Sequence, residues 1–345
     1  MDDPTQAALI RALSPRYSLQ ETFSEKRKRI CQAIFSKRYT FEKTLIVVIY
    51  IKKNSFFFFL SSFSECKMEF IVDEGKQIHE ECSTLILPAL SIGNVGQLAV
   101  DLLISSMKAE RIGYLDDPNV LPCVGNDAYW PVPQGNLALP LEVFDSSANA
   151  LTLVQQRSPL VKGMTVEFAK NVADFVAASG KKHVYILSGL DFGRWQTIDM
   201  SSGLQIYYLS SANTDGTDDN CERLGWKRLQ EYNPTQRQWM YLSTLAEGVA
   251  KQDDNLPFED ELGEEDYYPS LPFAALFSCL KAKGLNVTCL LCYCSEGDNI
   301  PDAFHLAEAA CKLLGLSPNN FQGGNWIVPF SWKTVYGPPP DTSLF

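Results

Sequence analysis

Short apolar runs alternate with amphipathic stretches from residue 84 onward. The stretch that begins at Thr84 opens with an apolar run typical of a buried strand, and a glycine-containing turn follows it. In the next stretch apolar residues recur at intervals of three and four, at Val95, Leu98, Ala99, Leu102 and Leu103. This spacing predicts a helix over 95–107 with one buried face. A short strand at 111–115 then completes a predicted βαβ unit.

The same alternation continues to the C-terminal region. We predict a hairpin from strands at 141–145 and 151–157, because the turn between them is short. Further elements are predicted as strands at 183–188, 204–209 and 285–294 and as helices at 161–179, 235–249, 271–283 and 303–314. Gly180 suits the position directly after the predicted helix 161–179. The order predicts an α/β fold, a single domain over 68–345 with a mainly parallel sheet flanked by helices.

Residues 1–67 differ from the rest. They contain a basic cluster at 26–29 and two apolar runs, at 45–51 and 56–60, separated by two lysines. Neither run reaches the about 20 apolar residues that a membrane-spanning helix needs. We expect this extension to be disordered or foreign to the native protein, with Met68 as the natural start. A targeting or regulatory arm, or a membrane tether over 45–60, remains the alternative.

The charge is unevenly distributed. The net charge is −11, but residues 1–67 carry 12 Lys/Arg against 6 Asp/Glu, so the remainder is strongly acidic. Two acidic loops, at 213–222 and 253–266, add to this character. Such a body argues against nucleic-acid binding and suits docking on a basic or mixed protein surface. The ten cysteines are scattered, several within apolar runs, as is typical of reduced core thiols in the cytoplasm or nucleus.

The glycine turn is the first candidate for chemistry. It consists of Gly93, Asn94, Val95, Gly96 and Gln97. It lacks the third glycine of a dinucleotide-binding loop, and it lacks the Lys and Ser/Thr of a phosphate loop. We therefore predict a packing role, in which Gly93 permits a turn and Gly96 lets the helix approach the sheet.

Metal and hydrolase chemistry are weakly supported. Cys289, Cys292 and Cys294 form C-x-x-C-x-C, but they lie in an apolar strand on which positions 289 and 292 face opposite sides. No nucleophile elbow surrounds Ser188, and a triad would need His305 from a predicted helix. We expect no catalytic residues, no metal and no cofactor. A nucleoside phosphorylase or hydrolase-like enzyme is the alternative.

Two further segments lie between or beyond the predicted elements. The first joins a strand to a helix and consists of Ser295, Glu296, Gly297, Asp298, Asn299, Ile300 and Pro301. Its acidic side chains could pair, although solvated acids at a helix start are favoured, with Pro301 near the first helical position. The second is the tail 333–345, in which three prolines precede Ser343, Leu344 and Phe345. Polyproline is a stiff spacer, so the tail suits insertion of its apolar end into a partner's pocket.

Three blocks together carry a resemblance. They are 88–105, with IGNVGQLAVDLLIS, 295–303, with SEGDNIPDA, and 326–332, with WIVPFSW. In order along 68–345 they resemble the eukaryotic proteasome assembly chaperone family, and within it the member that pairs with proteasome assembly chaperone 1. The first 67 residues have no counterpart.

The resemblance implies a non-catalytic chaperone with an α/β core. It implies a heterodimer with proteasome assembly chaperone 1 that binds proteasome α-subunits, promotes α-ring assembly and blocks aberrant ring pairing, in cytoplasm and nucleus and without membrane or nucleic acid. In the family, C-terminal tails enter pockets between α-subunits, often with a penultimate Tyr. This chain has Leu344 there, so insertion of Ser343, Leu344 and Phe345 is a hypothesis.

Overall fold

The computed structural model describes residues 67–79, 81–130, 136–194, 205–249, 267–317, 321 and 325–332. All of these belong to one of the two compact units into which the chain divides, Cys66–Phe345. The basic cluster and apolar runs before residue 67, the acidic loop 253–266 and the tail 333–345 lie outside the described residues. The boundary at Met68 therefore stays a prediction.

A mixed sheet of nine described strands forms the centre of the domain, in the order β1-β3-β6-β7-β2-β8-β11-β9-β10. The strands are β1 (Glu69–Val72), β2 (Thr84–Pro88), β3 (Glu110–Asp116), β6 (Leu141–Ser146), β7 (Leu151–Gln156), β8 (His183–Asp191), β9 (Ile206–Ser210), β10 (Lys227–Arg228) and β11 (Asn286–Cys294). The four central strands β7, β2, β8 and β11 pair in parallel. Antiparallel pairs flank them on both sides. A separate two-stranded sheet joins β4 (Gly125–Asn126) to β5 (Leu137–Ala138).

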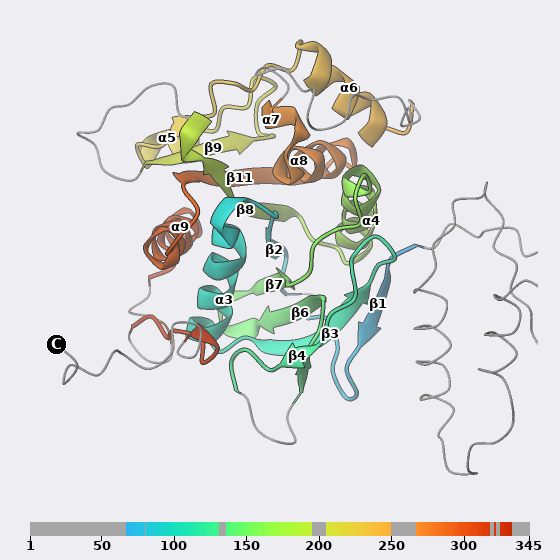
Figure 1. Ribbon diagram of the computed structural model, residues 1–345, viewed down its shortest axis with the longest axis vertical. Helices are drawn as coiled ribbons and strands as arrows, with labels where there is room; N and C mark the ends of the chain where they lie inside the picture. Colours follow the sequence, from blue (N-terminus) through green and yellow to red (C-terminus); the bar gives the residue numbers. More distant parts are fainter. Residues whose placement is uncertain are drawn as a thin grey trace, which may run out of the picture. The chain divides into compact units, whose positions relative to one another are not determined.

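Helices cover both faces of this sheet (Figure 1). On one face lie α3 (Val95–Met107) and α9 (Ile300–Leu313), and on the other lie α4 (Thr165–Ala178) and α8 (Pro272–Ala282). The helix α6 (Arg237–Ala246) packs against α8, and the short helices are α5 (Asp219–Arg223) and α7 (Tyr267–Ser270). The described residues also include the 3-10 turns η1 (Ile92–Asn94), η2 (Ser147–Asn149) and η3 (Phe192–Arg194). The predicted α/β class is confirmed.

The predicted βαβ unit exists in a split form. The pairing directions make β3 parallel to β2, but β6 and β7 lie between them. The hairpin is the reason, since its short turn η2 keeps β6 and β7 together and β7 takes the place beside β2. The hairpin prediction is confirmed, but its insertion into the βαβ unit was not predicted.

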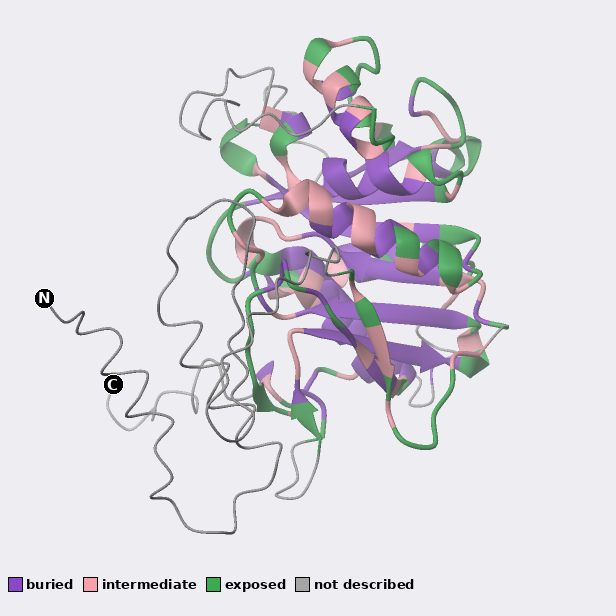
Figure 2. Ribbon diagram, turned by 90° about the vertical axis from the view of Figure 1, so that its right-hand side faces the viewer, coloured by how far each residue is buried: buried purple, intermediate pink, exposed green. Residues whose placement is uncertain are grey.

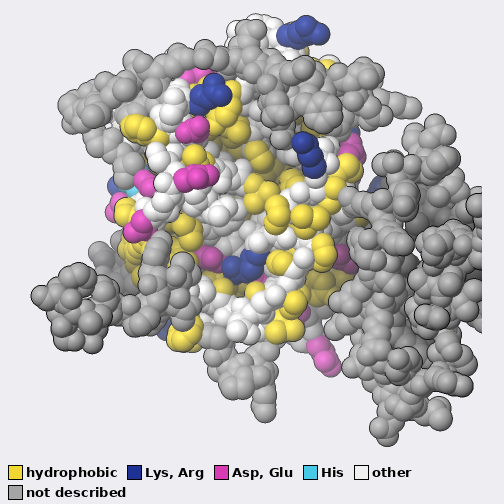
Figure 3. All heavy atoms as spheres, in the orientation of Figure 1, with side chains coloured by type: hydrophobic (Ala, Val, Ile, Leu, Met, Phe, Trp, Pro, Cys, Tyr) yellow, Lys and Arg dark blue, Asp and Glu magenta, His cyan; other side chains and the backbone are white. Residues whose placement is uncertain are grey.

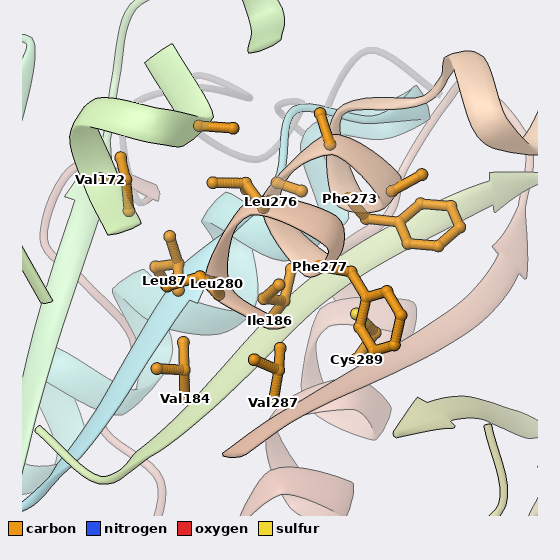
Figure 4. Close-up of a cluster of buried hydrophobic side chains, with 14 of the residues drawn as sticks. Leu87, Val172, Val184, Ile186, Phe273, Leu276, Phe277, Leu280, Val287 and Cys289 are labelled. Carbon is orange, nitrogen blue, oxygen red and sulfur yellow. The ribbon is translucent and has the colours of Figure 1, made fainter. Parts of the chain in front are cut away.

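Each central strand contributes side chains to two separate cores. On β2, Leu85 and Leu87 belong to the core under α4 and α8, whereas Ile86 belongs to the core under α3 and α9. Figure 4 shows the first core, where side chains of β2, β8 and β11 point toward α8. Because both faces are covered, the central strands are buried along almost their whole length, as Figure 2 shows in purple.

Most predicted boundaries are close to the observed ones. The largest difference is α4, which begins at Thr165 rather than at 161, because Val161 N–H donates to Asn119 O and Leu160 bridges to Val120. The helix ends as predicted, with Gly180 at φ +70° directly after its C-cap. The short strands β1, β4, β5 and β10 and the helix α7 were not predicted, since two to four residues carry no readable periodicity.

Within the described ranges, every helix is too short or too polar to cross a lipid bilayer.

Candidate functional site

The two loops that carry the resemblance lie together at the carboxyl ends of the central strands. The glycine turn follows β2, the 295–301 segment follows β11, and β8 lies between these strands in the sheet. At their junction Cys294 Sγ approaches Ile92 O at 3.7 Å. The carboxyl edge of a parallel sheet is where α/β proteins place ligand-contacting loops. We therefore define the signature edge as residues 91–97 with residues 294–301.

Gly93 contacts the second loop directly. It has φ +62°, and a Cβ atom at this position would overlap the side chain of Asn299, with its amide nitrogen at 2.8 Å. Both the left-handed conformation and the space therefore require glycine here. The turn predicted for Gly93 is confirmed, and its tightness comes from a residue 206 positions further along the chain.

Gly96 brings the start of α3 onto β8. A Cβ atom there would overlap the carbonyl oxygen of Leu187, and the carbonyl carbon would lie at 3.0 Å. Gly189 on β8 fits equally tightly, because its Cβ would lie 2.7 Å from Val95 Cγ1 and 2.9 Å from Cys294 Sγ. Ser91 Oγ accepts a hydrogen bond from Gly189 N at 2.9 Å. The predicted packing role of Gly96 is confirmed, since other parts of this chain fill the space that the glycines leave.

Asn299 organises the second loop. Its Nδ2 donates to Ser295 O at 2.8 Å and to Asp302 Oδ2 at 3.1 Å, while its Oδ1 is buried without a hydrogen-bond partner. Asp298 Oδ1 accepts from Ile300 N at 3.1 Å at the start of α9. Pro301 and Asp302 occupy the first turn of that helix, as predicted.

The tip of the second loop is exposed. Ser295, Glu296, Gly297 and Asp298 all lie at the surface, whereas Asn299 is buried. The acidic side chains therefore match solvated acids at a helix start better than a shielded acid–base pair. On the first loop Asn94 is also exposed, and its Oδ1 accepts a long hydrogen bond from Gln97 Nε2 at 3.4 Å. The signature edge thus presents polar side chains outward on a rigidly packed base.

The residues considered for hydrolase chemistry do not come together in the part of the chain that the structure describes. Ser188 is buried, and its hydroxyl donates only a long hydrogen bond to Gly189 O at 3.4 Å. His79 Nδ1 lies 3.0 Å from Asp145 Oδ2, and Asp145 is near the turn of the hairpin. His305 Nε2 is buried without a partner on α9. No hydrogen bond between described residues joins Ser188 to either histidine.

Two cavities of about 260 Å³ lie elsewhere. One is formed by β9, β10 and α9, with Trp226, Lys227 and His305 among its residues. The other lies between α6 and α8 around Trp239 and Lys281. Neither is lined by a residue of the signature edge.

The cysteines of β11 divide between the two cores, as predicted. Cys289 belongs to the core under α4 and α8, whereas Cys292 and Cys294 belong to the core under α3 and α9. Burial raises the pKa of the Cys289 thiol well above its usual value. Across the described ranges, no three His, Cys, Asp or Glu side chains are grouped as metal ligands.

A buried ionic network was not predicted from the sequence. Arg157 binds Glu142 at 2.7 Å and Asp101 at 3.1 Å, and Arg111 binds Glu142 at 3.2 Å. Tyr129 OH donates to Asp101 Oδ1 at 2.6 Å. Burial raises the pKa of Glu142, and the two arginines oppose that shift. The signal available in the sequence was a charge inside each of two apolar runs, Asp101 in AVDLLI and Glu142 in LEVF.

This network fixes a projecting segment to the sheet. We define the arm as residues 121–130 with 136–138, which contain β4 and β5. Arg111 Nη1 donates to Leu137 O at 2.7 Å, and Arg157 Nη2 donates to Tyr129 OH at 3.0 Å. The arm stands outside the buried strands of the main sheet (Figure 2).

Comparisons with known proteins find relatives that match most of this chain. Residues 85–319 match the PAC2 family. A curated relative from Danio rerio, named proteasome assembly chaperone 2, is 30% identical over 263 residues, which cover 74% of this chain and 91% of the relative. Proteins of the same name from Nematostella vectensis and Homo sapiens are 33% and 26% identical, covering 65% and 76% of this chain and 85% and 94% of those relatives.

Solved structures include an archaeal homologue of proteasome-assembly chaperone, PbaA from Pyrococcus furiosus. It is 16% identical, with a TM-score of 0.48, and the match covers 72% of this chain and 87% of that chain.

The described domain is therefore an α/β protein with two polar loops packed together at the carboxyl end of its central strands. The chain belongs to the PAC2 family.

Proposed function

We propose that this chain is a non-catalytic chaperone of proteasome assembly. It pairs with proteasome assembly chaperone 1 and binds proteasome α-subunits, promoting α-ring assembly and blocking aberrant ring pairing in cytoplasm and nucleus. The observation that carries the proposal is the match to curated relatives named proteasome assembly chaperone 2, which extends over 85–94% of their lengths in three animals.

The geometry of the signature edge supports a binding role. Asn299, Leu187 and Val95 fill the space beside the three glycines of this region. Packing within the domain therefore explains why glycine occupies these positions. The exposed tip from Ser295 to Asp298 is polar and acidic, which suits contact with a basic or mixed protein surface.

Co-purification tests the proposal. We expect the tagged full-length chain to recover proteasome assembly chaperone 1 and α-subunits from cells of its own species. Recovery of neither protein contradicts the proposal. A useful second measurement is co-expression, in which the partner should increase the soluble fraction of this chain.

Two alternatives make different predictions. An enzyme of the nucleoside phosphorylase or hydrolase type requires calorimetric binding of phosphate or nucleoside that depends on the 93–96 turn. A membrane-tethered adaptor requires the chain starting at Met1, but not one starting at Met68, to sediment with membranes. We expect neither result.

A further inference from the structure

The arm exposes apolar side chains to an unusual degree. The most exposed are Val124 at 66%, Trp130 at 64%, Leu137 at 55% and Leu121 at 41%. In Figure 3 hydrophobic side chains reach the surface in the region where Figure 1 places β4. A lone exposed apolar residue is ordinary, but several on one short segment mark an interaction surface.

The arm is also almost free of charge. From residue 119 to 141 the only Asp, Glu, Lys, Arg or His is Asp127, and its carboxylate accepts hydrogen bonds from Tyr129 N at 2.7 Å and Trp130 N at 3.0 Å. The domain around it is strongly acidic. Depletion of charge with an exposed tryptophan is the composition of an interface core.

The arm is held in place from below. Tyr129 donates to the buried Asp101 and packs edge-on against Phe144, with ring centroids 5.5 Å apart. At the base of the arm Leu121 N–H donates to Pro159 O at 3.0 Å. A preorganised surface loses less conformational entropy on binding than a mobile one. Burial of the charges in the network costs desolvation energy. The same network holds the apolar surface of the arm in place.

We propose that the arm is the dimerisation surface of this chain and that its occupant is the paired chaperone subunit, which presents an apolar, uncharged face. This inference rests on the proposed function. The proposed function has two kinds of partner, the paired chaperone and the α-subunits, and the charge distribution indicates which of them covers the arm. A permanent partner covers an apolar, neutral surface, because obligate interfaces resemble a divided core. Transient docking on α-subunits is served by the acidic remainder of the surface, which can steer association.

Substitutions on the arm test the proposal. Trp130→Ala and Val124→Glu change side chains that are about two-thirds exposed, so we expect the fold to tolerate both. We expect each to lower the affinity for proteasome assembly chaperone 1 about tenfold or more, measured as recovery of partner over a titration. Met240→Glu on α6 is the matched control, because Met240 is 53% exposed and lies outside the arm. It should recover the partner like the unchanged chain.

A second measurement needs no substitution. Cys123 is exposed on the arm, whereas the other cysteines of the described ranges are buried. We expect maleimide to label Cys123 in the isolated full-length chain and to label it at least tenfold more slowly in the heterodimer, read on the Cys123 peptide by mass spectrometry. Equal labelling rates would overturn the proposal.

The outcomes separate this proposal from the function on which it rests. If the unchanged chain recovers no partner chaperone, the proposed function fails. If the unchanged chain recovers it and both arm variants do so equally well, the dimerisation surface lies elsewhere and only the present inference fails. Loss of α-subunits with retention of the partner chaperone would assign the arm to α-subunit docking and likewise overturn the inference.

Discussion

Asn299 occupies the space in which residue 93 would carry a side chain. The amide of Asn299 lies against Gly93, and it also donates to Ser295 O, so one side chain connects the loop after β2 with the loop after β11. Direct packing between the two loops therefore contributes to their relative position.

Gly93→Ala should destabilise the chain by about 1–3 kcal/mol, because the new Cβ combines a strained φ with overlap on Asn299. Urea unfolding measures the effect. Gly75→Ala is the matched control, since Gly75 has φ +76° but nothing within 4 Å of its Cβ position. Gly75→Ala should lower the free energy of unfolding only by the cost of backbone strain. The double variant Gly93→Ala with Asn299→Ala should be less destabilised than the sum of the single variants, and additive effects would contradict the packing argument.

Glu142 should make stability depend on pH. Burial raises its pKa in the folded chain above the ordinary 4.5 of the unfolded chain. Its proton therefore stabilises the fold fully below pH 4.5, and this contribution is lost as the pH rises through the folded-state pKa. Glu142→Gln removes that dependence, so the stability of the unchanged chain relative to the variant should fall as the pH rises across this window.

The control for Glu142 is a carboxylate in a surface ion pair. Glu110→Gln removes an exposed partner of Lys76, and its stability difference from the unchanged chain should vary little with pH. Urea unfolding between pH 4 and pH 8 measures both variants. A Glu142→Gln difference as flat as that of Glu110→Gln would show that burial does not raise the pKa of Glu142 in the folded chain.

The thiols should react in two classes. Burial raises the pKa of Cys221, Cys279 and Cys311 to about 12, so almost no thiolate exists at pH 8. Iodoacetamide should modify the exposed Cys123 first and leave these three thiols unmodified in the folded chain, as peptide mass spectrometry can show. Unfolding in urea should expose all of them. Rapid modification of Cys279 in the native chain would contradict its place in the core.

Under the proposed function, deletion of Ser343, Leu344 and Phe345 should weaken α-subunit recovery and leave heterodimerisation intact, because we expect dimerisation to use the folded body and the tail to contact the α-subunits. Co-purification with both partners measures the effect. Replacing the same three residues by Ser-Tyr-Phe should restore or strengthen α-subunit binding if pocket insertion is the mechanism, and unchanged α-subunit recovery after deletion would contradict it.

The long periodic elements were readable from the chain. The strand that starts at Thr84 was predicted, and the helix 95–107 was predicted with the bounds that the structure has, since its apolar positions repeat clearly after the glycine turn. The packing roles of Gly93 and Gly96 were also predicted, but the atoms that require them were not. Those atoms belong to Asn299 and Leu187, which are far away in sequence.

The sequence by itself determined the α/β class, the two-faced burial of the central strands and the family to which the chain belongs, because hydrophobic periodicity and motif identity are local properties. Only the tertiary structure decided that the hairpin β6–β7 separates β2 from β3, that the two signature loops meet, and that two partly buried arginines hold the charge-poor arm. These features depend on contacts between distant residues, and pairwise complementarity across the fold leaves no periodic signal in a single sequence.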